Sequence, residues 1–211
     1  LPSLDVLAAP VTMAHLKAGS GNGNGHFGSS NPEAFVLSDG NYTGEQFSYR
    51  IRLASAKSET RLRIVTKYAD DTHWGYIAYD GTPDNNGNGH WFYEFKNETT
   101  GYPDLSGLPG INQNDEVIVS GRYEDDGLHI SVENETTGQS GEAVANNAAF
   151  TGLKDLQGKI GMGAGAYSGQ LTEVYFSDVK VDNASVDYTG WALYKPELAG
   201  QVWELVHIVA S

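Results

Sequence analysis

Apolar and polar residues alternate along much of the chain with a period of two, which is typical of half-buried β-strands. The segment EQFSYRIRLAS (residues 45–55) is one example, with Phe47, Tyr49, Ile51 and Leu53 on one face. TRLRIVTKYAD (60–70) and QLTEVYFSDVKVDN (170–183) repeat the pattern. DEVIVSGRYE (115–124) and GLHISVEN (127–134) are separated by two aspartates, which predicts a β-hairpin.

Other segments are apolar on both faces, as expected of strands that are covered on both sides. These are HWGYIAYD (73–80), GHWFYEFK (89–96) and QVWELVHIV (201–209). Helical signals are weak, since GEAVANNAAFTGLKDL (141–156) has room for one short turn only. The 26 glycines mark frequent turns between about twelve strands. We therefore predict an all-β fold, a single antiparallel β-sandwich or jelly roll formed by residues 1–211.

Composition narrows the range of partners. The formal net charge is −14, with 27 acidic against 13 basic residues, which argues against nucleic acid and anionic membranes as partners. No apolar stretch is long enough to span a membrane, so we expect no membrane insertion. The chain has no cysteine, which excludes disulfides, thiolate zinc sites and cysteine nucleophiles. The first residues, LPSLDVLAAP, do not resemble a signal peptide and look like a cut from a longer chain.

Common catalytic signatures are absent from the sequence. It contains no Glu-x-Asp-x-x-Glu run of the sandwich glucanases, no G-x-S-x-G, no H-E-x-x-H and no P-loop. Glu94, Glu116 and Glu173 lie within predicted strands, so a pair of carboxylates remains open. The glycine-rich GMGAGAYSG (161–169) has no helix after it to bind phosphate, and close backbone packing explains it better. On this basis we expect the domain itself not to be an enzyme.

A loop with alternating oxygen-bearing side chains precedes the most aromatic strand. Asp84, Asn86, Asn88 and Gly89 have the spacing of the first half of a calcium-binding EF-hand loop. The acid that would close such a site is missing, because position 95 is Phe95. The loop therefore has two interpretations, a Ca²⁺ site that takes further ligands from elsewhere, or a plain Asn/Gly turn.

Aromatic residues on the two neighbouring strands suggest a sugar-binding platform. Indole and phenol rings join an apolar face to a hydrogen-bonding tip, which suits stacking on sugars. The candidate carbohydrate-binding residues are Trp74, Tyr76, His90, Trp91, Tyr93 and Arg63. The competing interpretation is that these rings belong to the core.

All five arginines lie on the polar faces of predicted strands: Arg50, Arg52, Arg61, Arg63 and Arg122. Their guanidinium groups suit recognition of a carboxylate or sulfate on a glycan. Pairing with acidic residues of neighbouring strands is the favoured alternative, because acids are in twofold excess.

The run DTHWGYIAYDG…GHWFYEFK…YPDLSGLP…DEVIVSGRYEDDGLHISVEN resembles the concanavalin A-like β-sandwich modules of large bacterial glycosidases. The resemblance is to modules of endo-α-N-acetylgalactosaminidases of glycoside hydrolase family 101 and covers residues 45–182. GKIGMGAGAYSGQLTEVYFSDVKV (158–181) is similar to the late strands of such lectin-like domains. The resemblance implies an extracellular accessory module, secreted or on the cell surface, which binds host or mucin-type glycans beside the other domains of its parent glycosidase.

Three functions therefore remain open. The first is a non-catalytic carbohydrate-binding module, and the second is a structural domain that packs on a catalytic neighbour without binding sugar. The third is a stand-alone sandwich-fold glycoside hydrolase or lyase. Exposed rings favour the first, whereas paired carboxylates of which one has a raised pKa favour the third.

Overall fold

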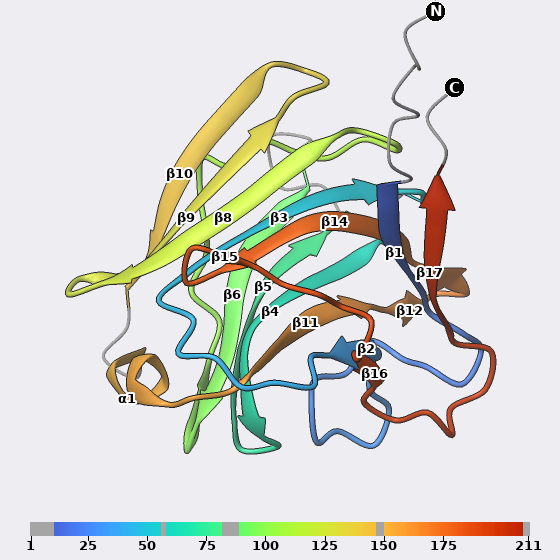
Figure 1. The fold of residues 1–211 in the computed structure, drawn as a ribbon, viewed down its shortest axis with the longest axis horizontal. Coiled ribbons are helices and arrows are strands. Elements are labelled where there is room, and N and C mark those ends of the chain that lie inside the picture. Colours follow the sequence, from blue (N-terminus) through green and yellow to red (C-terminus); the bar gives the residue numbers. More distant parts are fainter. Residues whose placement is uncertain (1–10, 56–57, 82–88, 147–149, 209–211) are drawn as a thin grey trace, which may run out of the picture.

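The computed structural model describes residues 11–55, 58–81, 89–146 and 150–208. Two antiparallel sheets pack face to face, and Figure 1 shows them as an upper and a lower layer. The prediction of an all-β sandwich is confirmed. The described part contains one short helix, α1 (Phe150–Asp155), at the position where the sequence left room for a single turn.

The first sheet has the strand order β10-β9-β8-β3-β14-β1-β17, with β15 added beside β14. Its strands are β1 (Val11–Lys17), β3 (Gln46–Leu53), β8 (Val117–Glu124), β9 (Gly127–Asn134), β10 (Gln139–Ala145), β14 (Glu173–Val181), β15 (Ala184–Ser185) and β17 (Val202–Ile208). The predicted hairpin is the β8–β9 pair, in which Glu124 lies opposite Gly127.

The second sheet has the order β16-β2-β11-β4-β5-β6-β7. Its strands are β2 (Ala34–Leu37), β4 (Arg61–Asp70), β5 (His73–Asp80), β6 (His90–Asn97), β7 (Thr99–Gly101), β11 (Lys159–Ala164) and β16 (Ala192–Leu193). A separate two-stranded ribbon joins β12 (Ala166–Tyr167) to β13 (Gln170–Leu171). Among the described residues, no helix has the length and apolar character needed to cross a bilayer.

The main core lies between the two sheets, where the alternating residues of each strand turn their apolar side inward. Along β3 the burial alternates as predicted, with Phe47, Tyr49, Ile51 and Leu53 buried. A second apolar cluster covers the opposite, outer face of the second sheet. There Phe27, from the loop before β2, packs on Phe35 and Trp74. The middle of this sheet is therefore buried on both faces.

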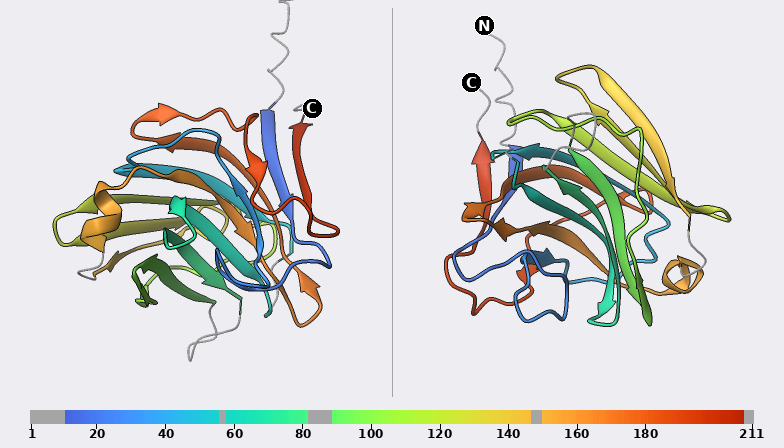
Figure 2. Two further views of the ribbon diagram at one scale, coloured as in Figure 1. Left: turned by 90° about the horizontal axis from the view of Figure 1, so that it is seen from below. Right: turned by 180° about the vertical axis from the view of Figure 1, so that it is seen from behind.

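The segment at the C-terminal end was predicted to be a strand, which is confirmed, and to be covered on both faces, which is wrong. β17 is an edge strand that pairs only with β1 in the described sheet, and its side chains from Val202 to His207 are half-buried or exposed. Figure 2 shows β1 and β17 side by side in both views. Its apolar residues Trp203 and Leu205 still pack against the core from the edge.

Candidate active site

The predicted aromatic platform does not form, because the strand register sends its rings to opposite faces of the second sheet. In the β5–β6 pair, Tyr76 lies opposite Glu94, whereas Trp91 lies opposite Tyr79. Trp91 and Tyr93 therefore point into the core between the sheets. Trp74 and Tyr76 belong to the apolar cluster on the outer face.

All four candidate rings are also buried, with at most 2% of their surface exposed. Trp74 stacks on Tyr76 at 5.2 Å between ring centroids and lies beneath His26. On the other face, the Trp91 Nε1–H donates to the Pro109 carbonyl over 2.9 Å. Rings packed in this way offer no open face to a sugar, so the expectation of an exposed platform built from them is corrected.

His90 is the one member of the predicted set that reaches solvent, with 44% of its side chain exposed. Its Nε2 lies 2.8 Å from Asp104 Oδ1, and its ring stacks on Phe92. Arg63, which was expected to face a sugar, is 4% exposed and held in ion pairs. The predicted calcium ligands Asp84, Asn86 and Asn88 lie outside the described residues.

Buried charged groups gather on the outer face of the second sheet, next to Arg63. The guanidinium of Arg63 contacts two carboxylates, with 3.1 Å from Nε to Glu33 Oε1 and 2.7 Å from Nη1 to Asp80 Oδ1. Arg61 adds a longer pair of 3.6 Å to Asp80. Glu94 lies on the same face and is hydrogen-bonded to the Tyr76 hydroxyl. We call the group Glu33, Arg63, Tyr76, Asp80 and Glu94 the carboxylate cluster.

The register of four strands brings this cluster together. Arg61 on β4 lies opposite Asp80 on β5, and Arg63 lies opposite Ala78. On the other side of β4, Arg63 lies opposite Gly163 of β11. Glu33 immediately precedes β2, the strand on the far side of β11. Residues that are distant in sequence thus share one face within the span of an arginine side chain.

Gly163 of β11 and Gly165, which follows the strand, make the space that the cluster occupies. A Cβ at Gly163 would lie 2.9 Å from Arg63 Cβ and 2.6 Å from the Phe35 ring. At Gly165 it would lie 2.6 Å from Arg61 Cβ and 3.3 Å from Glu33 Cγ. Such contacts are too close for a real side chain. The interpretation of the glycine-rich segment as close packing is confirmed. Without side chains at Gly163 and Gly165, Arg63 and Arg61 can pack against this segment.

Burial changes the acid–base behaviour of two of the carboxyl groups. Loss of solvation raises the pKa of Glu33 to about 8, and the nearby charge of Arg63 only partly opposes this rise. Burial also raises the pKa of Glu94, against the hydrogen bond from Tyr76. Among the described residues, neither carboxylate oxygen of Glu33 has a hydrogen-bond partner of good geometry, although Arg63 Nε lies 3.1 Å from Oε1. Near neutral pH, Glu33 is therefore a protonated carboxylic acid with a proton to donate.

Asp80 and Phe92 connect the cluster to the surface. The Asp80 side chain is 20% exposed, and Phe92 is half-buried over the Arg63 guanidinium at 5.4 Å. The arrangement offers an acid that holds its proton, a second carboxylate paired to arginine, and an aromatic ring at the rim. These are the parts needed for general acid–base chemistry.

The remaining arginines are also paired with acids. Arg50 contacts Glu135 at 2.6 Å, and Arg122 contacts Glu124 at 2.6 Å. Arg52 lies 3.9 Å from Glu116 and over the Tyr175 ring. The favoured interpretation of the arginines, pairing across strands, is confirmed.

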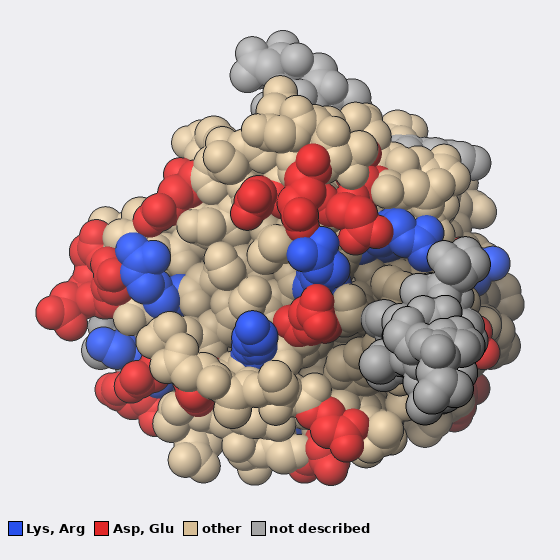
Figure 3. Space-filling model, turned by 45° about the horizontal axis from the view of Figure 1, so that its top comes forward, with Lys and Arg blue, Asp and Glu red and all other residues tan. Residues whose placement is uncertain are grey.

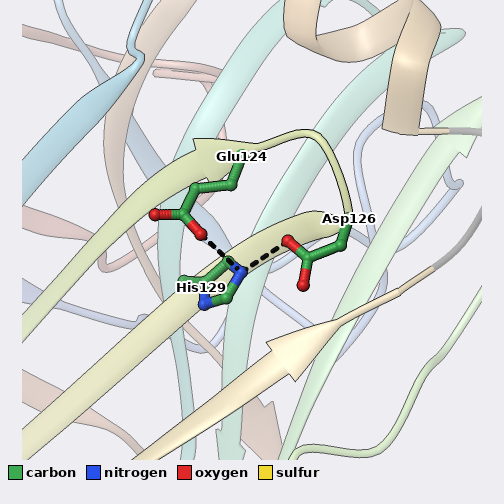
Figure 4. A group of neighbouring side chains, drawn as sticks. All are labelled: Glu124, Asp126 and His129. Carbon is green, nitrogen blue, oxygen red and sulfur yellow. Dashed lines mark hydrogen bonds and ion pairs between the residues drawn. The ribbon is translucent and has the colours of Figure 1, made fainter.

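A further group of metal-ligand types lies at the β8–β9 turn (Figure 4). His129 Nε2 is 2.6 Å from Asp126 and 2.9 Å from Glu124, and its Nδ1 is 3.2 Å from Glu142. These hydrogen bonds raise the pKa of His129. Each ring nitrogen of His129 has a carboxylate acceptor, so these contacts account for the arrangement without a metal.

Sequence reasoning identified Arg63 and named Glu94 as an open carboxylate, but it missed the role of Glu33. Glu116 and Glu173, named with Glu94, lie on the first sheet or next to it and take no part in the cluster. The only signal for Glu33 was an acid placed directly before the apolar run AFVL of β2. An acid at a strand start is ordinary at the level of sequence, and only the pairing of β2 with β11 brings it near Arg63.

Comparison with known proteins gives a fold but no family. No protein-family model and no curated protein matches the sequence. Among solved structures, xylan β-1,4-xylosidase from Bacillus halodurans C-125 matches with a TM-score of 0.52 and 13% identity. That match covers 77% of this chain and 32% of the xylosidase, so the chain spans about a third of the larger protein's length.

Two further structures resemble the chain more loosely. Scytalido-glutamic peptidase matches with a TM-score of 0.41 and 14% identity, over 77% of this chain and 86% of the peptidase. The carbohydrate-binding module CBM66 from Bacillus subtilis matches with a TM-score of 0.42 and 15% identity, over 69% of this chain and 78% of the module. The xylosidase match is consistent with a concanavalin-like sandwich, and no comparison shows the family 101 relationship.

The expectation that the domain is not an enzyme is wrong. The xylosidase, which matches with a TM-score of 0.52, is an enzyme, so the comparisons do not support the expected lack of activity. The absence of contiguous signatures is weak evidence against activity, because carboxylates on separate strands leave no contiguous motif.

Proposed function

We propose that the protein is a sandwich-fold carbohydrate-active enzyme, a glycoside hydrolase or lyase, with its active site at the carboxylate cluster. One observation carries the proposal: Glu33 is fully buried, has no well-aligned hydrogen-bond partner among the described residues, and has its pKa raised to about 8 by loss of solvation. Cleavage of a glycosidic bond requires a proton for the leaving oxygen, and a buried carboxyl with a raised pKa is suited to give it. That the substrate is a carbohydrate is inferred by analogy, from the likeness of the fold to that of the xylosidase.

Each member of the cluster then has a distinct role. Glu33 is the proton source, and because its side chain is enclosed it acts through a relaying water that enters past Asp80 and Phe92. Asp80, the more exposed carboxylate, faces the developing positive charge or activates water. Arg63 holds Asp80 through an ion pair of 2.7 Å, and its Nε lies 3.1 Å from Glu33 Oε1 and fixes the position of that carboxyl group. Phe92 offers an apolar face to a sugar ring at the rim.

The extracellular setting and the parent glycosidase acting on host or mucin-type glycans remain predictions from the sequence resemblance. The sequence resemblance makes mucin-type O-glycans the first substrates to test. Xylan and acidic polysaccharides are tested beside them, as substrates of the hydrolase and lyase classes proposed above. Release of reducing ends or of unsaturated products identifies the hydrolase and the lyase respectively.

The decisive experiment compares Glu33→Gln with Glu197→Gln, an exposed control, on whichever glycan the wild type cleaves. We expect Glu33→Gln to lower kcat by about 10²–10⁴-fold, the usual contribution of a general acid. The wild-type rate should fall as pH rises through about 8, and the variant should lose this limb of the profile. Full activity of folded Glu33→Gln, or cleavage of casein and of no glycan, contradicts the proposal.

A further inference from the structure

A polar hollow lies on the outer face of the first sheet, on the side of the sandwich away from the carboxylate cluster. It has a volume of about 250 Å³ and is bordered by β3, β8, β9 and β14. Figure 3 shows an uncharged area on this face, with isolated basic and acidic groups around it. The polar side chains that line the hollow are Gln46, Ser48, Ser120, Arg122, His129, Ser131, Lys180 and Asn183.

Strand register places the serines in one row across the sheet. Ser48 lies opposite Ser120, and Ser120 lies opposite Ser131 on the next strand. Lys180 of β14 lies opposite Ser48 and extends the same row. Because neighbouring strands are about 4.8 Å apart, the row presents an ammonium group and three hydroxyl groups at regular intervals.

These polar groups have no partner of their own within the described residues. None of the three serine hydroxyls makes a hydrogen bond to the described protein, and the Lys180 ammonium has no carboxylate within 4.0 Å there. The nearby Arg122, in contrast, is paired with Glu124 and Glu142. In a chain with twice as many acids as bases, a lysine without a counter-ion beside a polar hollow is a favourable position for an anion.

A second hollow of about 380 Å³ adjoins the first and shares Ser120 and Ser131 with it. Its wall includes Glu133, Ser140 and Glu142, whose oxygens accept hydrogen bonds. The first hollow lies just below, and the second near the lower end of, the roughly 300–1,000 Å³ of ordinary ligand sites, so each suits about one sugar-sized unit. Together they form a groove with a cationic end and an acceptor-rich end.

We propose that this groove binds an acidic glycan and that the first hollow holds a uronic acid unit. The carboxylate of the sugar pairs with Lys180, and its hydroxyls bond to Ser48 and Ser120. The next, neutral unit lies over Ser131 and donates hydroxyl hydrogens to Glu133 and Glu142. The site is separate from the carboxylate cluster and does not depend on the proposed catalysis.

The proposed binding of a uronic acid is tested by titrating the isotope-labelled full chain and following its amide chemical shifts. The ligands are sodium glucuronate and methyl glucoside, which lacks the carboxylate. We expect glucuronate to give saturable shifts on β3, β8 and β9 and to bind more tightly than methyl glucoside. Lys180→Gln should weaken glucuronate about tenfold, the value of one charge-assisted hydrogen bond. Lys96→Gln, on the other sheet, is the matched control and should leave binding unchanged.

Ser120→Ala separates binding from stability. Since this hydroxyl has no partner in the described protein, its removal should leave the melting temperature unchanged while weakening glucuronate severalfold. The proposal is overturned if glucuronate causes no saturable shifts on these strands, or if methyl glucoside binds as tightly. It is also overturned if Lys180→Gln behaves like Lys96→Gln.

Discussion

At the scale of single residues, environment outweighs residue type. Glu33 and Glu197 are the same amino acid, yet one is enclosed beside Arg63 and the other is exposed. An ionised carboxylate is strongly disfavoured in an enclosed, poorly solvated position, so Glu33 keeps its proton instead. The same burial that suits Glu33 to acid catalysis therefore makes the stability of the protein depend on pH.

The stability of the protein should fall between pH 4.5 and about 8 because of Glu33. Unfolded Glu33 releases its proton near pH 4.5, whereas folded Glu33 retains it until about pH 8. The unfolded state thus binds fewer protons in this window, and the free energy of unfolding decreases by about 1.4 kcal/mol per pH unit. Denaturant unfolding of wild type and Glu33→Gln at pH 5, 6, 7 and 8 measures the effect.

The amide side chain of the Glu33→Gln variant cannot titrate, so the difference in unfolding free energy between the two proteins should shift steadily in favour of the variant as pH rises. Above about pH 8 the difference should level off. A constant difference from pH 5 to 8 would mean that Glu33 ionises normally in the folded protein. Glu197→Gln serves as the control and should follow the wild type throughout.

At the scale of elements, the two ends of the described chain complete the first sheet. β1 pairs with β14 on one side and with β17 on the other, so β17 covers the outer edge of β1 and is itself the edge strand of the sheet. Trp203 stacks on Phe176 at 6.0 Å and on Trp191 at 6.4 Å. The edge strand thus contributes both backbone hydrogen bonds and an aromatic anchor.

Removal of residues 200–211 should unfold or aggregate the protein. The deletion leaves β1 as an unpaired edge and uncovers apolar surface, at about 25 cal/mol per Å². Thermal melting and size-exclusion chromatography measure the outcome. A shortened chain that is monomeric and melts with the full-length protein would show that β17 contributes little.

At the scale of the whole molecule, the chain carries a large excess of negative charge, with 27 acidic against 13 basic residues. The net charge of −14 coexists with arginines that are all paired with acids or stacked on tyrosine rings. Most of the excess negative charge is therefore left on the surface, where like charges repel one another. The candidate active site and the proposed glycan groove lie on opposite sides of the sandwich, so mutations in them should act additively.

Added salt should stabilise the protein. Raising ionic strength from about 0.01 to 0.15 M shortens the Debye length from about 30 to 8 Å, which screens the repulsion among distant acids. Buried pairs such as Arg63 with Asp80 are screened less. We expect the melting temperature at neutral pH to rise over this range. A lower melting temperature in salt would show that surface ion pairs outweigh the general repulsion.

The sequence by itself determined the fold class, because a period of two over many short segments can bury one face only in a sheet. Residues within one strand were also assigned correctly relative to each other: Trp91, Tyr93 and Phe95 share one face and His90, Phe92 and Glu94 the other. Alternation is a local property of the backbone, so it can be read from consecutive residues.

Only the tertiary structure decided what lies beside each strand and what covers it. Register between β5 and β6 separated Trp74 and Tyr76 from Trp91 and Tyr93, and a one-residue slip would have united them. The loop that carries Phe27 buried an outer face that looked available for sugars. Glu33 met Arg63 only because β11 lies between β2 and β4 with glycines where side chains would collide. Strand order, register and loop cover depend on contacts between distant residues, and these contacts turned an expected binding surface into a core and an unremarked glutamate into the candidate acid.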